Sequence, residues 1–448
     1  MSDLPSQWHA TKLGNLVTVI RGVTFPASAK SYELNDSHIP CLRTSHIQRE
    51  LRWDDVYLIP ASYVKRDEQL LRRGDILMSM ANSANLVGKT CINDTDNVAC
   101  FGAFLAAIRC SHVEHKYVYY FLRSAFAQSY LKNSASQTVN IANISVSELE
   151  KLTIPLPPLS EQARIVKALD GFLAQVDTLK ARLDALPTLI DRFRQSVLST
   201  AISGKLTSST KSDWRSMKAA EACAKVQSGG TPKVGFFDSG VPFLKVYNIV
   251  KNKIDFDYKP QFVNEESHSH SLLKSKTVPG DVLMNIVGPP LGKIATVPST
   301  HLEWNINQAI ALFRPSDKIT SEWLSISLHG GEALKKVILE TRGIAGQVNI
   351  SLSQCRDFVF EVPPVVEQVT IGNKTSQLFA FADQLEARIT DARQRVDALT
   401  QSILAKAFRG ELVPQDPNDE PASVLLERIA AQRAADPKPK RGRKAAAH

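Results

Sequence analysis

The sequence predicts an α/β (α+β) protein in which two repeated α/β domains are separated by two long helices. Three observations support this prediction. A segment of about fifty residues occurs twice. Each copy carries apolar residues at alternating steps of four and three, as in a coiled-coil helix. Each copy also follows a longer stretch in which short β-rich runs alternate with turns and one helical run.

The duplication is clearest at a proline-rich motif. Residues 157–162 (PPLSEQ) return as residues 363–368 (PPVVEQ), a displacement of 206 residues that then holds without a gap. Further upstream the match is weaker, but residues 73–77 (RGDIL) still correspond to residues 279–283 (PGDVL). The identities downstream of the motif include Asp177, Arg182, Leu198, Gly204 and Leu206, which reappear as Asp383, Arg388, Leu404, Gly410 and Leu412.

We expect the first α/β domain at residues 1–155 and the second at residues 208–361. Strands are expected in the first domain at 16–20, 76–80 and 104–108, with a helix near 115–131. In the second domain the strand candidates are 241–247, 282–287 and 310–313, with a helix near 321–339. Both domains have an ordinary size for an independent core.

The two long helices are expected at residues 156–207 and 362–413. Each follows a Pro-Pro segment and ends at a glycine, Gly204 or Gly410. Pro187 should kink or break the first helix, because proline removes a backbone hydrogen bond. The two apolar stripes most simply pack against each other, with Thr375 interrupting the second. They include Ile165, Leu169, Phe172, Val176, Leu179 and Leu183, and then Ile371, Leu378, Leu385, Ile389, Val396 and Leu399.

Composition describes a globular chain with a modest positive charge. Of 448 residues, 43% are hydrophobic and 22% charged, and no apolar run reaches the roughly 18 residues of a membrane span. We therefore expect a cytoplasmic protein. The net charge is +9, of which +4 lies in the last thirteen residues, so charge permits nucleic-acid binding without requiring it. Residues 414–448 are expected to form a linker, a short helix at 422–435 and a basic tail.

No catalytic site is evident. Residues 83–90 (SANLVGKT) resemble a phosphate-binding P-loop, but Ser83 replaces its first glycine and no helix is expected to follow. The six cysteines lack metal-ligand spacing, so neither zinc nor disulfides are expected. His268 and His270 are interpreted as solvated histidines. We predict that the chain is not an enzyme by itself.

Polar and basic residues occur at matching loop positions of both domains, which favours a binding face. Arg, Asn and Gln form paired hydrogen bonds with base edges, while Lys and Thr suit phosphates. The first domain offers Arg21, Thr24, Lys30, Arg43, Ser45, Asn82, Lys89, Gln137 and Asn140. The second offers Thr231, Lys233, Lys245, Tyr247, Asn248, Asn285, Lys293, Asn307, Gln308, Gln347 and Asn349.

The duplicated helices, each opening with Pro-Pro-x-x-Glu-Gln, resemble the repeats of type I restriction–modification specificity subunits. The scaffold signatures of that family's target recognition domains also appear. They are residues 229–232 (GGTP), 241–245 (VPFLK), 279–283 (PGDVL) and 347–350 (QVNI), echoed at 39–45, 73–77 and 137–141. The resemblance runs from about Trp8 to Val413.

The resemblance implies two target recognition domains, each contacting one half of a bipartite, asymmetric site in double-stranded DNA. It implies that the helices form an antiparallel coiled coil whose length sets the gap between the half-sites. It also implies two DNA adenine methyltransferase (M) subunits and restriction motor/nuclease (R) subunits as partners. S-adenosylmethionine, ATP and Mg would be bound by those partners, and no cofactor by this chain.

Two alternatives remain open from the residues alone. One is a coiled-coil structural adaptor that binds no DNA, which a DNA shift assay would distinguish. The other is a P-loop-like nucleotide-binding enzyme built on Lys89, which would lose nucleotide binding on Lys89→Ala.

Overall fold

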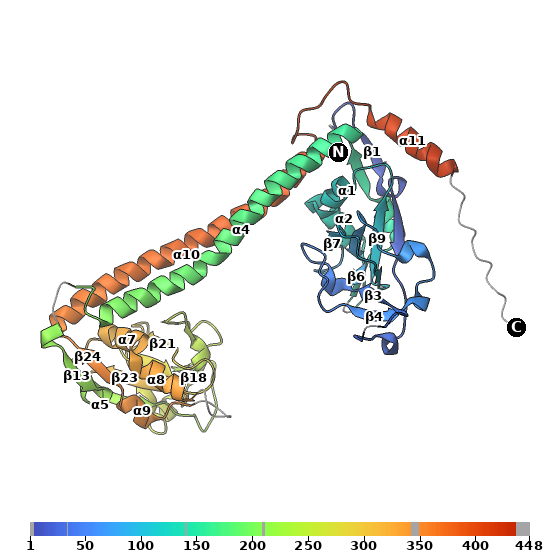
Figure 1. The fold of residues 1–448 in the computed structure, drawn as a ribbon. Helices are drawn as coiled ribbons and strands as arrows, with labels where there is room; N and C mark the ends of the chain where they lie inside the picture. Colours follow the sequence, from blue (N-terminus) through green and yellow to red (C-terminus); the bar gives the residue numbers. More distant parts are fainter. Residues whose placement is uncertain (1–3, 34, 139–140, 208–210, 342–348, 436–448) are drawn as a thin grey trace. The chain divides into compact units, whose positions relative to one another are not determined.

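The computed structural model describes residues 4–33, 35–138, 141–207, 211–341 and 349–435. The chain forms two compact units, Met1–Arg182 with Ala392–His448, and Leu183–Asp391. Each unit combines one domain of strands and short helices with part of each of two long helices (Figure 1). Among the described residues, no helix is long and apolar enough to cross a membrane.

The domain of the first unit is built on a four-stranded antiparallel sheet of order β2-β9-β5-β7. Its strands are β2 (Val17–Arg21), β9 (Leu105–Cys110), β5 (Ile76–Ser79) and β7 (Thr90–Ile92). A second sheet, β4-β3-β8, contains one parallel pair, β3 with β8. The strands of this second sheet are β4 (Tyr57–Pro60), β3 (His38–Leu42) and β8 (Cys100–Phe101). The other strands are β1 (His9–Lys12), β12 (Thr153–Leu156), β6 (Ala81–Asn82), β10 (Ser136–Thr138) and β11 (Ile141–Asn143). The helices are α1 (His115–Arg123), α2 (Ala125–Ser134) and α3 (Val146–Lys151).

The domain of the second unit repeats this topology. Its main sheet has the order β14-β23-β20-β21, and a second sheet, β18-β15-β22-β19, again holds one parallel pair, β15 with β22. The sheet strands are β14 (Cys223–Ser228), β23 (Ile310–Pro315), β20 (Val282–Asn285), β21 (Ile294–Thr296), β18 (Phe262–Val263), β15 (Val241–Leu244), β22 (Trp304–Ile306) and β19 (Lys276–Thr277). The others are β13 (Arg215–Lys218), β24 (Val359–Val362), β16 (Ile249–Val250), β17 (Lys253–Ile254), α5 (Ala219–Ala222), α6 (Glu265–Ser269), α7 (Ser321–Gly330), α8 (Glu332–Thr341) and α9 (Leu352–Arg356). The expected strands are confirmed in both domains. Each expected helix is present but divided in two, into α1 and α2 in the first domain and α7 and α8 in the second. The mostly antiparallel sheets make the fold α+β.

The weak sequence match between residues 73–77 and residues 279–283 has a structural cause. Gly74 and Gly280 adopt φ values of +87° and +88°, which residues with a side chain rarely tolerate. The aspartate that follows each is almost fully buried and accepts two hydrogen bonds from one arginine of the neighbouring strand. Asp75 binds Arg109 at 2.6 and 2.8 Å, and Asp281 binds Arg314 at 2.8 and 2.9 Å.

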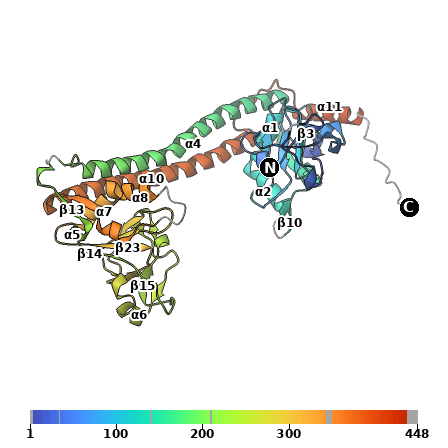
Figure 2. The ribbon, with the colours of Figure 1, turned by 60° about the horizontal axis from the view of Figure 1, so that its bottom comes forward.

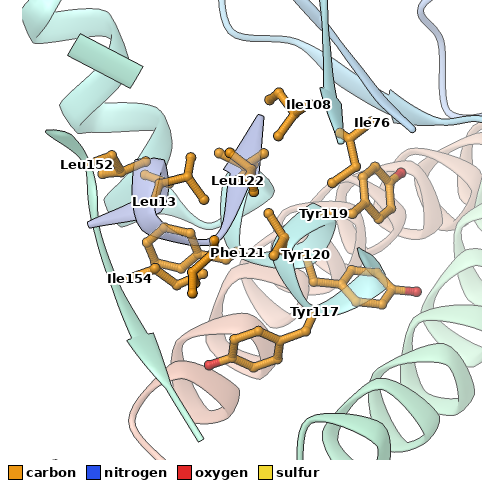
Figure 3. Close-up of a cluster of buried hydrophobic side chains, with 14 of the residues drawn as sticks. Leu13, Ile76, Ile108, Tyr117, Tyr119, Tyr120, Phe121, Leu122, Leu152 and Ile154 are labelled. Carbon is orange, nitrogen blue, oxygen red and sulfur yellow. The ribbon is translucent and has the colours of Figure 1, made fainter. Parts of the chain in front are cut away.

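Apolar side chains fill the space between the main sheet of the first domain and helix α1 (Figure 3). Ile76 and Ile108 point from β5 and β9 toward Tyr119 and Leu122 of α1, and all four are buried. Alternate side chains of a strand face one side of its sheet, so these strands present one apolar row to the helix. This packing fixes α1, and with it the loops that surround its ends.

The long helices α4 (Leu159–Ile202) and α10 (Val365–Phe408) contain 44 residues each and run antiparallel (Figures 1 and 2). Lys180 pairs with Asp397 at 2.6 Å in the first unit, and Arg194 pairs with Asp383 at 2.7 Å in the second. From Lys180 to Arg194 the chain advances fourteen residues along α4, and from Asp397 to Asp383 it goes back fourteen residues along α10. The ion pairs of both units therefore fit one antiparallel register. The expected antiparallel coiled coil is confirmed.

Two expectations about these helices need correction. Pro187 does not break α4, which continues through it, because Ile190 and Val197 beyond the proline remain anchored by burial. The alternative expectation, a kink at Pro187, stays a prediction. The predicted seam residues Phe172, Leu179 and Leu399 are 46, 44 and 43% exposed, whereas Ile165, Leu169, Val176 and Ile371 are buried. The other predicted seam residues, Leu183, Leu378, Leu385, Ile389 and Val396, are half-buried, as expected for a two-helix seam.

Helix α11 (Ala422–Ala435) occupies the residues predicted for the short C-terminal helix. It packs on the first domain, where Leu425 and Ile429 join the main apolar core. Arg433 donates hydrogen bonds to the carbonyl oxygens of Gly14 and Val17 at 2.6 and 3.0 Å. The segment after α10 therefore belongs structurally to the N-terminal domain.

Candidate nucleic-acid interface

The repeated Pro-Pro-x-x-Glu-Gln motif joins each domain to its long helix. Trp8 donates its indole N–H to Glu161 at 3.0 Å, and Trp214 donates to Glu367 at 3.1 Å. Burial raises the pKa of the Glu161 carboxyl, and the hydrogen bond from Trp8 opposes this shift. The glutamates of the motif therefore connect the first strand region of each domain to the start of α4 or α10.

The glutamines of the motif complete each joint. Gln162 accepts the backbone N–H of Glu114 at 3.0 Å and donates to the Pro157 carbonyl at 2.9 Å. Gln368 accepts the backbone N–H of Thr320 at 2.7 Å and donates to the Pro363 carbonyl at 2.8 Å. Both glutamines are fully buried. They hold the N-terminal end of α1 or α7 against the long helix, so each domain has a defined orientation on its own helix segment.

A second contact links each domain to the same position of the helix repeat. Arg49 pairs with Asp177 of α4, and Lys253 pairs with Asp383 of α10 at 3.3 Å. The two aspartates are separated by the repeat displacement of 206 residues. The repetition of this aspartate in the sequence could have indicated the contact. Neither of its partners, Arg49 and Lys253, was predicted as a functional residue.

Matching short turns carry the basic loop residues of the two domains. The Arg43 N–H donates to Nδ1 of His46 at 2.9 Å, and the Lys245 N–H donates to Oδ1 of Asn248 at 3.0 Å. Burial lowers the pKa of His46 below its ordinary value. These caps leave the side chains of Arg43 and Lys245 half-buried at the start of each turn.

Several predicted contact residues are part of the loop framework instead. Asn248 is fully buried and Asn285 is 1% exposed. Asn248 donates to the carbonyls of Asp255 and Tyr258, and Asn285 bonds the Lys293 N–H and the Pro290 carbonyl. Their prediction as DNA contacts is wrong, because side chains without free surface cannot reach a base edge. The amide oxygens of Asn82 and Asn307, which are half-buried, accept the N–H groups of Ser83 and Ala309.

The other predicted residues retain accessible surface. Lys30 and Arg43 come together at the ring of Tyr57, with their cationic groups 5.2 and 5.6 Å from its centroid, and Arg43 also pairs with Asp55. Lys245 lies 4.2 Å from the centroid of the Phe236 ring. Residues Lys89, Lys293 and Tyr247 are half-buried, and Arg21, Thr24, Lys30, Ser45, Thr231, Lys233, Gln308 and Asn349 are exposed. Asn140, Gln347 and the Gln137 side chain lie outside the described residues.

The segment at residues 83–90 cannot act as a P-loop. The N–H groups of Leu86 and Val87 donate to the Ser83 carbonyl, and that of Gly88 donates to the Ser79 carbonyl. Thr90 then starts strand β7, where a nucleotide-binding loop would start a helix. The backbone therefore offers no free row of donors to a nucleotide, which removes the basis of the nucleotide-binding alternative.

His268 corrects another expectation. It is 2% exposed rather than solvated, and its ring nitrogens lie 2.7 Å from Asn305 Oδ1 and 2.8 Å from Glu303 Oε2. The hydrogen bond from His268 lowers the pKa of Glu303. Its partners lie 35 and 37 residues away along the chain, so local spacing could not reveal them. Across the described residues, no group of three His, Cys, Asp or Glu side chains is placed to hold a metal ion.

Known proteins resemble the whole chain. Residues 5–188 match the model of the type I restriction modification DNA specificity domain. The StySPI specificity subunit of Salmonella potsdam is 30% identical over 99% of both chains. The EcoKI specificity subunit of Escherichia coli K12 is 29% identical over 98% of both.

Solved structures agree on the fold. A chain from a structure of the type I R-M system, described for its complex assembly and conformational transition, aligns with a TM-score of 0.67 at 19% identity and covers 92% of this chain and all of its own. The HsdS subunit of Thermoanaerobacter tengcongensis aligns with a TM-score of 0.56 at 18% identity, over 91% of this chain and 98% of its own.

The duplicated domains with cationic loops, together with the matched family model, define a protein that recognises DNA sequence. The chain belongs to the specificity subunits of type I restriction–modification systems, a family of non-catalytic subunits.

Proposed function

We propose that each α/β domain recognises one half of a bipartite, asymmetric DNA site and that the helix pair sets the gap between the halves. The observation that carries this proposal is the repetition of one topology and one joint with different loop residues. The Trp–Glu and Gln contacts are the same in both units, while the exposed residues at the loops differ, with Arg21 and Ser45 in one domain and Thr231 and Lys233 in the other. A conserved frame with divergent loops suits two separate specificities.

The DNA contacts proposed for the second domain run through Lys245 and Lys293. Replacing either with alanine should weaken binding to all DNA sequences and reduce the slope of log affinity against log salt by about one, if the lysine contacts a phosphate. A base contact would instead relax one position of the half-site at a cost of roughly 1–3 kcal/mol. Affinity titrations at several salt concentrations distinguish these results. Unchanged affinity in the double variant would show that this face is not the interface.

The partners proposed for the chain are two DNA adenine methyltransferase subunits, one at each joint, with restriction subunits completing the complex. The joints support this stoichiometry because they are repeated and present apolar surface. Leu159 at the start of α4 and Val365 at the start of α10 are both 44% exposed, and Val366 is 81% exposed. S-adenosylmethionine, ATP and Mg would then be bound by the partners.

Light scattering of the reconstituted complex should give two methyltransferase subunits for each copy of this chain. Val366→Asp should reduce this number to one, because a buried carboxylate opposes docking at the second joint only. Leu302→Asp, at an 88% exposed residue of the second domain, is the matched control and should leave two partners bound. A single partner on the unaltered chain contradicts the proposal.

The chain by itself should neither methylate nor cleave DNA and should bind it poorly. Only +5 of its net charge lies outside the last thirteen residues, so few phosphates can be neutralised by this surface alone. Methylation and shift assays of the purified chain, with and without its partners, test this expectation. Methyl transfer by the isolated chain would contradict it.

A further inference from the structure

The first domain contains a polar hollow whose lining, apart from one lysine, lies outside the predicted DNA-binding residues. It has a volume of about 240 Å³ and lies between the turn that follows β3, the start of β7 and the helices α1 and α2. Of its lining residues only Lys89 was predicted as a functional residue. The lining consists of Gln48, Arg49, Lys89, Thr90, Tyr119, Arg123 and Gln128.

The hollow is positively charged. Arg49, Lys89 and Arg123 all line it, and no lining residue is acidic. Lys89 donates to Gln48 at 2.8 Å and Arg123 donates to the Tyr119 hydroxyl at 3.0 Å, so two of the three cations have only neutral partners there. Arg49 pairs with Asp177 of α4, which fixes its position beside the hollow.

Thr90 adds an unused polar group to this site. Its side chain is 6% exposed, and its hydroxyl oxygen has no hydrogen-bond partner in the described structure. Buried hydroxyl groups in native proteins usually have a partner, because burial without one costs free energy. Two cations without acidic partners, Lys89 and Arg123, together with the unsatisfied hydroxyl of Thr90 form a site suited to an oxyanion.

The second domain lacks this site, although its backbone is the same. Thr90 pairs with Met78 as Ile294 pairs with Met284, so a buried isoleucine replaces the hydroxyl. A side chain at Gly88 would meet Gln128, whereas one at the equivalent Gly292 would meet Leu334. The second domain keeps Lys293 at the position of Lys89, but it has the apolar Ile294 and Leu334 where the first domain has Thr90 and Gln128, so the polar lining is a feature of the first domain.

We propose that this hollow binds one phosphate group of the DNA backbone, adjacent to the half-site contacted by the first domain. The inference rests on the proposed function. A phosphate fits the converging cations and the Thr90 hydroxyl, and phosphate contacts position a protein on the duplex without selecting bases. A nucleotide is disfavoured because the N–H groups of residues 86–88 already donate to the carbonyls of Ser83 and Ser79.

The test uses the full chain assembled with its methyltransferase partners and a duplex containing the methylated motif. Lys89→Gln with Arg123→Gln should reduce the slope of log affinity against log salt by about one, which corresponds to one lost phosphate contact, and should weaken binding on the order of tenfold. Thr90→Val should weaken binding less and leave the slope unchanged. The methylated motif should be the same in all variants.

Arg73→Gln is the matched control. Arg73 is an exposed arginine of the same domain that pairs with Asp96, and the adjacent Gly74 lies against His115 at the opposite end of α1 from Arg123. This variant should keep the slope and affinity of the original complex. Melting curves identify a variant that fails to fold, in which case the single Lys89→Gln variant and the nearly isosteric Thr90→Val variant carry the test.

Three results would overturn the inference. An unchanged salt slope in the folded double variant would show that no phosphate is bound there. A relaxed motif would assign the hollow to a base. Saturable binding of inorganic phosphate to the DNA-free complex, lost in the double variant while the slope for DNA stays unchanged, would assign it to free phosphate. Absence of any motif in the unaltered complex would instead contradict the proposed function itself.

Discussion

Replacing residues 219–358 with the corresponding segment of a relative is expected to change one half of the methylated DNA motif and leave the other half intact. The replaced segment lies between β13 and β24, which pair along their whole length from Arg215↔Val362 to Lys218↔Val359. Retaining these strands and Trp214 preserves the hydrogen bond to Glu367, and the groups of the replaced segment that bond Gln368 are backbone groups, which the new segment also supplies. The new domain should therefore adopt the orientation of the old one while presenting different loops.

Methylome sequencing of DNA from cells that express the hybrid with its methyltransferase subunit measures this result directly. The reciprocal replacement of residues 13–152, between β1 and β12, is the internal control and should change the opposite half. If either hybrid changes both halves of the motif, or neither half, the two domains are not independent recognition modules.

Inserting one heptad into each long helix is expected to lengthen the gap between the half-sites and leave their sequences unchanged. Seven helical residues add about 10 Å, and B-DNA rises about 3.4 Å per base pair, so the gap should grow by up to about three base pairs. The insertions belong between the Lys180–Asp397 and Arg194–Asp383 ion pairs, after residue 185 on α4 and before residue 392 on α10. Seven residues preserve the alternating steps of the seam.

The matched control inserts seven residues into α4 only. It should impair assembly or activity, because every pair beyond the insertion loses its partner on α10. Methylome sequencing of the double insertion gives the new gap. An active complex with the original gap would refute the role of the helix pair in spacing.

The repeated sequence by itself determined the architecture. The displacement of 206 residues holds for β1 and β13, β5 and β20, and α4 and α10. The heptad steps located helices that the structure confirms, and Gly204 and Gly410 adopt the left-handed conformation just beyond them. Periodicity and backbone requirements are local properties, which is why residue order alone reveals them.

Only the tertiary structure decided which polar loop residues are accessible. The side-chain amides of Asn248 and Asn285 could form hydrogen bonds with a base edge. In the structure they form hydrogen bonds with neighbouring backbone groups instead. Arg49, Thr90 and Arg123 are separated by tens of residues and become one site only when the turn after β3, strand β7 and helix α1 pack together. In the same way, packing between the helices decided that α4 continues through Pro187 and that Phe172 is exposed. The sequence specifies the chemistry of each side chain. The exposure of a side chain and its approach to others depend on contacts between distant segments, and these contacts exist only in the folded chain.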